Sequence, residues 1–155
     1  MLAAMRTLKL LTLLLALSLA LFAADNPFLG TWTLNVAKCR YTVGQPQKEL
    51  TVTFQQEGEK IKRTAIGAES DGTPIKEQDS RAWDGKYHAF DPPIILVAVT
   101  RVGDRTLDVK VKQNGKIIDR STMMVSKDGR TMTATRSGKD EQGRPFVGTD
   151  VFDKQ

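Results

Sequence analysis

The residues most capable of chemistry are one cysteine and one histidine. Cys39 lies between Lys38 and Arg40, and positive charge beside a thiol favours the nucleophilic thiolate. The alternative is that Cys39 is a small buried hydrophobic residue at a strand end, or an incidental free thiol. His88 follows Tyr87 at a turn, and a single imidazole supplies neither a histidine-rich zinc site nor a Ser-His-Asp triad. We therefore predict no catalytic residue, no metal site and no cofactor. If the protein is nevertheless an enzyme, Cys39 is the one nucleophile to name.

Two arginines are the best candidates for contacts with a ligand. Side chains alternate between the two faces of a strand, so Arg63 faces inward if Ile61 does. Arg136 likewise faces inward if Met132 and Ala134 do. The alternative is that both arginines face outward, because burying an unpaired charge is costly. The predicted ligand-binding residues are Arg63, Arg136, Tyr41 and Tyr87.

The elements that would position these residues are short strands. Turn sequences rich in Gly, Asp and Asn recur between residues 57 and 143, mostly 11 to 14 residues apart, which leaves room for one strand per interval. Residues 49–54 and 106–112 alternate apolar and polar side chains, as strands with one buried face do. We predict an all-β fold, an up-and-down antiparallel meander barrel of about 8–10 strands.

One interval, residues 37–48, is longer than a hairpin link and contains Tyr41. A long link at the mouth of a barrel is a candidate lid or entrance loop. The alternative is a passive loop with one short helical turn.

Residues 1–24 have the layout of a secretory signal peptide: basic residues come first, and an apolar run and small residues follow. The candidate cleavage points follow Ala20, Ala23 and Ala24, and the alternative is a retained anchor. We expect an exported protein, periplasmic or extracellular, with one domain over residues 25–155 and no membrane span after cleavage.

The charge of this domain argues against nucleic acid as a partner. Residues 1–24 contain two of the 23 basic residues and no acid, so a net charge of +5 falls to +3 after cleavage. Nucleic-acid binding would require a basic stripe with interleaved aromatic residues. With one cysteine there is no internal disulfide, and we expect a monomer.

The segment Phe28-Leu29-Gly30-Thr31-Trp32, at the start of the predicted domain, resembles the first strand of lipocalins and fatty-acid-binding proteins, the calycin group. The resemblance implies that Gly30 and Trp32 form the barrel floor. The segments 126–133 and 151–154 resemble a late hairpin and the end of a fatty-acid-binding barrel. The phrases at 30–35 and 83–87 also resemble a family of small secreted bacterial proteins of no established activity.

Two departures from that pattern bear on the ligand. Fatty-acid-binding proteins carry Arg-x-Tyr on the last strand, and this sequence has Asp150 and Phe152 there. Residues 37–48 are also too few for a two-helix lid. The resemblance implies an exported protein that binds a small apolar or amphipathic ligand, although not a fatty acid by that route. The alternative is a solid-cored barrel that acts through its surface as an envelope, interaction or stress protein.

Overall fold

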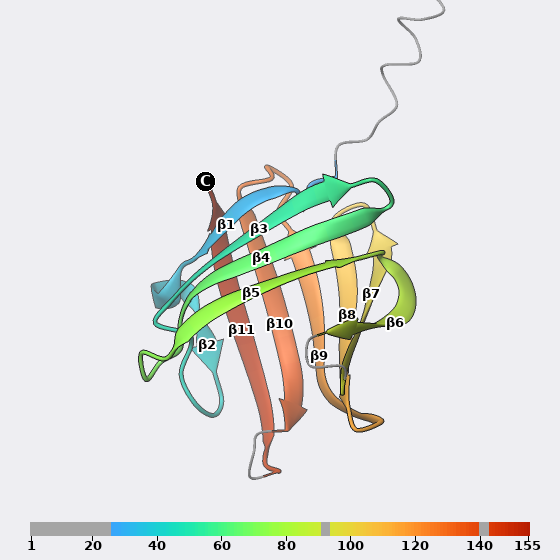
Figure 1. Cartoon of the computed structure of the whole chain (residues 1–155). Helices are drawn as coiled ribbons and strands as arrows, with labels where there is room; N and C mark the ends of the chain where they lie inside the picture. Colours follow the sequence, from blue (N-terminus) through green and yellow to red (C-terminus); the bar gives the residue numbers. More distant parts are fainter. Residues whose placement is uncertain (1–25, 91–93, 140–142) are drawn as a thin grey trace, which may run out of the picture.

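The structure, a computed structural model, describes residues 26–90, 94–139 and 143–155. The predicted signal peptide, residues 1–24, lies outside the described residues. The described residues form eleven strands and one 3-10 turn (Figure 1). These are β1 (Gly30–Leu34), η1 (Val36–Lys38), β2 (Arg40–Tyr41), β3 (Glu49–Glu57), β4 (Lys60–Ala68), β5 (Pro74–Arg81), β6 (Asp84–Phe90), β7 (Ile95–Gly103), β8 (Thr106–Gln113), β9 (Lys116–Val125), β10 (Thr131–Lys139) and β11 (Pro145–Lys154).

The strands form one antiparallel sheet that curls into a nearly closed barrel (Figure 1). The strand order is β5-β4-β3-β1-β11-β10-β9-β8-β7-β6, so β1 joins the two halves by pairing with both β3 and β11. The path ends at β5 and β6, which follow each other in the chain without pairing. The predicted all-β meander barrel is confirmed. Ten strands lie on this path, and β2 is a further two-residue strand beside β11.

The first part of the long link belongs to the barrel wall. After η1, β2 pairs with β11 at Gly148 and Thr149, further along the strand that β1 already contacts. The interval 37–48 therefore begins with a short helical turn and a strand. It does not contain a two-helix lid.

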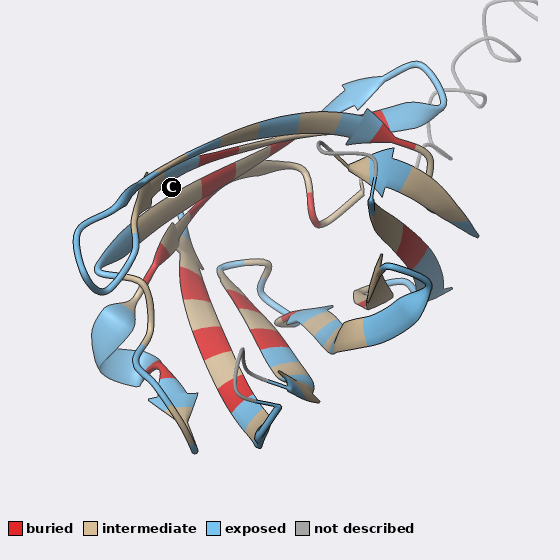
Figure 2. Ribbon diagram, turned by 60° about the horizontal axis from the view of Figure 1, so that its bottom comes forward, coloured by how far each residue is buried: buried red, intermediate tan, exposed pale blue. Residues whose placement is uncertain are grey.

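The alternation predicted from the sequence is visible as bands of different burial along the strands (Figure 2). Trp32 pairs with Val52, and Val52 pairs with Ala65. All three are buried, at most 5% exposed. The residues between them point to the opposite face, because side chains on a strand alternate with a period of two.

One end of the barrel is filled with side chains. The indole of Trp32 is fully buried and donates a hydrogen bond from Nε1 to the carbonyl of Phe28 at 2.8 Å. Trp83 packs edge-to-face against Phe28 and Phe54, with ring centroids 5.7 and 5.9 Å apart. The same core cluster includes Ile61, Val99, Leu107, Val125, Met132 and Phe152. These residues come from the strand ends nearest the 58–59, 104–105 and 126–130 hairpins.

At the opposite end, two glycines permit close strand contacts. A Cβ atom on Gly67 would lie 2.1 Å from the carbonyl oxygen of Glu49, and one on Gly138 would lie 2.3 Å from that of Ile118. Both contacts are with backbone atoms, which cannot rotate away as a side chain does. Glycine at these positions therefore lets β4 and β10 curve tightly against β3 and β9.

Candidate ligand-binding cavity

The end of the barrel away from the Trp32 cluster encloses an open cavity of about 440 Å³. Its apolar wall consists of Leu50, Ile75, Phe90, Ile95, Val97, Val109, Val111 and Ile118. Its polar wall consists of Gln47, Arg63, Glu69, Glu77, Asp79, Arg81, Asp119, Ser121, Arg136 and Asp150. The barrel is thus filled at one end and hollow at the other. This size and mixture of groups match the usual form of a small-molecule site.

A first charged cluster lies on β4 and β5. Arg63 Nη1 donates to Glu77 Oε2 at 2.9 Å and lies 3.6 Å from Asp79 Oδ1. Arg81 contacts Asp79 Oδ2 through both Nε and Nη2, each at 2.7 Å. Arg63 lies directly opposite Asp79 on the paired strands β4 and β5. Because the inward-facing residues of two adjacent strands lie side by side, these charged groups come together.

A second charged cluster lies on β9, β10 and β11. Arg136 donates to Asp119 Oδ2 from Nη2 at 2.6 Å and from Nε at 3.1 Å. Its Nη1 atom lies 3.9 Å from Asp150 Oδ2. Burial alone would lower the pKa of Arg136, but the carboxylates of Asp119 and Asp150 outweigh it and raise that pKa. The guanidinium therefore stays charged inside the barrel.

Tyr41 closes this second cluster from β2. Its hydroxyl donates a hydrogen bond to Asp150 Oδ1, and burial together with that carboxylate raises the pKa of Tyr41 far above its ordinary value. A Cβ on Gly148 would lie 2.7 Å from the Tyr41 ring, so the absent side chain makes room for the ring on β11. Tyr41 is accordingly a neutral donor that holds Asp150 in place.

The structure brings three of the four predicted ligand-binding residues to one region. Arg63 and Arg136 line the cavity, as the burial of Ile61, Met132 and Ala134 on their strand faces requires. Tyr41 reaches it through Asp150. Tyr87 does not line the cavity. It pairs with Ala98, whose neighbour Val97 faces inward, so Tyr87 and Ala98 lie on the outer face. The Lys112 Nζ atom lies 3.9 Å from the centroid of the Tyr87 ring.

The two residues predicted for the barrel floor meet β11. Gly30 adopts a left-handed φ of +111°, and a Cβ there would lie 3.1 Å from Lys154 Cε. The Lys154 ammonium lies 5.0 Å from the centroid of the buried Trp32 ring. Both residues thus belong to the filled end and not to the cavity.

The environment of Cys39 does not favour a nucleophile. Cys39 is buried, and its thiol donates to the carbonyl of Asn35 at 3.3 Å. Burial raises the pKa of Cys39, and the nearby positive charge of Arg40 is too weak to reverse this. The expectation that flanking basic residues would favour the thiolate is therefore wrong, because desolvation dominates.

The other reactive candidate, His88, interacts locally. His88 Nε2 lies 2.8 Å from Asp84 Oδ1 on the same strand. Within residues 26–90, 94–139 and 143–155, no group of three or more His, Cys, Asp or Glu side chains is placed to hold a metal ion. In the same part of the chain we find no helix with the length and hydrophobicity that a membrane span requires.

Several polar groups of the cavity were not predicted. Glu77, Asp79 and Arg81 alternate with exposed residues on β5 and face inward, and Asp119 does the same on β9. Sequence reasoning missed these residues because it looked for apolar side chains on the inner face, and here the inner positions are charged. The signal that could have found them is the alternation along the strand: starting from Ile75, every second residue of β5 faces inward.

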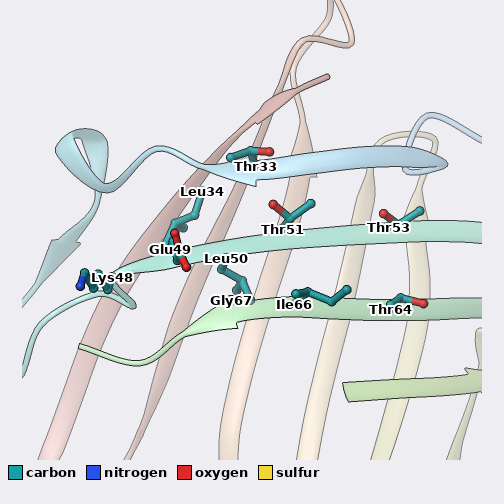
Figure 3. Close-up of a pocket in the computed structure, with 10 residues that line it drawn as sticks. All are labelled: Thr33, Leu34, Lys48, Glu49, Leu50, Thr51, Thr53, Thr64, Ile66 and Gly67. Carbon is teal, nitrogen blue, oxygen red and sulfur yellow. The ribbon is translucent and has the colours of Figure 1, made fainter. Parts of the chain in front are cut away.

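A second hollow, of about 430 Å³, lies on the outside of the barrel (Figure 3). Figure 3 shows Thr33, Thr51, Thr53, Thr64 and Ile66 on β1, β3 and β4 along its wall. These residues alternate with the buried inner face described above. Because the charged groups that cluster in the structure converge on the interior instead, we take the interior cavity as the candidate site.

Comparison with known proteins shows a likeness in fold to solved structures and no match in sequence. No protein-family model matches the chain, and no curated protein matches it in sequence. The structure is similar to secretory abundant heat soluble protein 4 from Ramazzottius varieornatus, with a TM-score of 0.59 and 14% identity over 84% of this chain and 96% of that one. It is also similar to zebrafish ileal bile acid-binding protein complexed with cholic acid, with a TM-score of 0.54 and 14% identity over 83% of this chain and 99% of that one. The chain therefore has a calycin-like fold, as its Gly-x-Trp segment and turn spacing predicted.

Proposed function

We propose that this protein binds one small amphipathic molecule inside the barrel and acts as an exported binding protein, not as an enzyme. The observation that carries the proposal is the cavity of about 440 Å³ with an apolar wall and two charged clusters. Apolar surface removed from water contributes about 25 cal/mol per Å², and a few polar groups fix the orientation of the ligand.

The arrangement of the two barrel ends supports this proposal over a barrel that acts only through its surface. A solid core would fill the interior with Trp32, Phe54, Leu50 and the methionines. Trp32 and Phe54 do fill the hairpin end, but Leu50 lines the cavity. The neighbour from zebrafish is named for binding a bile acid and was solved with cholic acid, which is consistent with a ligand inside such a barrel.

Export is part of the same proposal, and its support is the signal-peptide layout of residues 1–24. We expect the processed protein in the periplasm or the extracellular medium, as a monomer without a bound nucleic acid. The intact mass of the exported protein would identify which of the three predicted cleavage points is used.

The experiment is native mass spectrometry of protein purified from the exported fraction, compared with its denatured mass. A reproducible adduct that is lost on denaturation is expected, and its mass gives the ligand class. The variant Val111→Phe, which fills the cavity, should lose the adduct. Lys110→Phe is the matched control, because it makes a similar change at the neighbouring residue. Val111 lines the cavity, whereas Lys110 does not and lines a separate hollow. No adduct, together with no binding of a neutral solvatochromic dye, would refute the proposal.

A further inference from the structure

The cavity is more acidic than the protein that surrounds it. Three arginines and five carboxylates line it, which gives a formal net charge of −2, whereas the chain as a whole carries +5. The three arginines, Arg63, Arg81 and Arg136, each contact a lining carboxylate. The positive groups that would attract an anionic ligand are therefore already paired, and an excess of negative charge remains.

Two buried carboxylate oxygens of residues that line the cavity lack a hydrogen-bond donor. Among the described residues, the buried side-chain atoms without a hydrogen-bond partner are Asp79 Oδ1 and Asp119 Oδ1, and both residues line the cavity. Asp79 Oδ1 still lies 3.6 Å from Arg63 Nη1. Asp119 differs because both bonds from Arg136 go to its Oδ2 atom, which leaves Oδ1 with no partner.

A buried acceptor without a donor raises the free energy of the folded protein, and a ligand that supplies the donor removes this penalty when it binds. A carboxylate oxygen accepts and does not donate, so a ligand carboxylate cannot fill this role and would be repelled by the net negative wall. An ammonium group supplies both a donor and a compensating charge.

Resting on the proposed function, we propose that the ligand is a cationic amphiphile whose ammonium N–H group donates to Asp119 Oδ1. Its apolar body lies along the aliphatic wall that includes Val97, Val109 and Ile118. Asp79 Oδ1 is the second acceptor, on the β5 side of the same cavity.

The test compares four probes with the same twelve-carbon chain: dodecylammonium, dodecyltrimethylammonium, dodecanol and dodecanoate. Each probe is added, below its own critical micelle concentration, to the wild-type protein with a neutral solvatochromic dye bound, and displacement of the dye measures binding of the probe. We expect dodecylammonium to bind at least tenfold more tightly than dodecanoate. It should also bind more tightly than dodecyltrimethylammonium, which has the charge but no N–H donor, and more tightly than dodecanol, which has a donor but no charge.

The matched variants are Asp119→Asn and Asp108→Asn. Asp119→Asn should weaken dodecylammonium about tenfold and change dodecanol less than twofold. Asp108→Asn removes a half-buried carboxylate that accepts a hydrogen bond from Thr122 and does not line the cavity, and it should change neither. The ranking of head groups on the wild-type protein tests the proposal even if Asp119→Asn does not fold.

The possible failures are distinguishable. Equal or tighter binding of dodecanoate would overturn the cationic ligand while leaving the binding function in place. Equal binding of dodecyltrimethylammonium would overturn the donor bond to Asp119, and equal binding of dodecanol would overturn the requirement for a positive charge. If no probe displaces the dye and no adduct accompanies the exported protein, the binding function itself fails.

Discussion

Replacing Arg136 by methionine should destabilise the barrel through the charges it leaves behind. Arg136 is the cation that contacts both Asp119 and Asp150, and those two carboxylates are only 15% and 6% exposed. Methionine is about as long as the aliphatic part of the arginine side chain and fits irregular spaces, so the change mainly removes the guanidinium, with its positive charge and its hydrogen bonds to Asp119. The result is two carboxylates held near each other in a largely buried place.

The expected magnitude follows from this exposure. Removing one partner of a fully buried ion pair costs about 3–5 kcal/mol. The Arg136 side chain is 34% exposed and the cavity is open to solvent, so water recovers part of that loss. We expect a decrease of about 2 kcal/mol in the free energy of unfolding at pH 7, or roughly 6–8 °C in the melting temperature.

Urea unfolding of a second variant at pH 7 tests the cause as well as the size. Asp119→Asn added to Arg136→Met removes one of the two unpaired charges, so the double variant should recover part of the stability that Arg136→Met loses. Arg120→Met, an exposed arginine one residue from Asp119, should change stability by about 0.5 kcal/mol or less. No recovery in the double variant would show that packing, and not charge, is responsible.

Three further predictions concern the filled end and the strands. Trp32→Phe should cost about 1–3 kcal/mol in urea unfolding, because the buried carbonyl of Phe28 loses its donor; a cost below 0.5 kcal/mol would contradict this. Cys39 should react with a thiol reagent at least tenfold more slowly in the folded protein than in the urea-unfolded one, since it is buried with a raised pKa; equal rates would contradict the structure. Gly67→Ala should destabilise by about 1–3 kcal/mol because its Cβ would collide with the Glu49 carbonyl, whereas Ala at the open turn position Gly58 should cost only about 1 kcal/mol through its positive φ. Gly67→Ala should therefore cost at least about 1 kcal/mol more than Gly58→Ala, and an equal or smaller cost would contradict the close approach.

The fold could be predicted because it depends on local information. Turn residues at regular spacing define where strands end, and a side-chain period of two defines which residues share a face. Once Ile61 and Met132 are recognised as core residues, Arg63 and Arg136 are placed inside by geometry alone. The sequence therefore determined the barrel class and named both arginines as ligand candidates, but it left open whether they face inward or outward.

The partners of those arginines depended on the register between strands, which the sequence does not display. Asp79 meets Arg63 only because β4 and β5 pair at that register, and a shift of one residue would reverse every face. In β6 the register shifts between Asp84 and Tyr87, and Tyr87 lies on the outside. Tertiary structure alone decided that one barrel end is filled and the other hollow, because that outcome depends on how side-chain volumes from distant strands sum around a common axis.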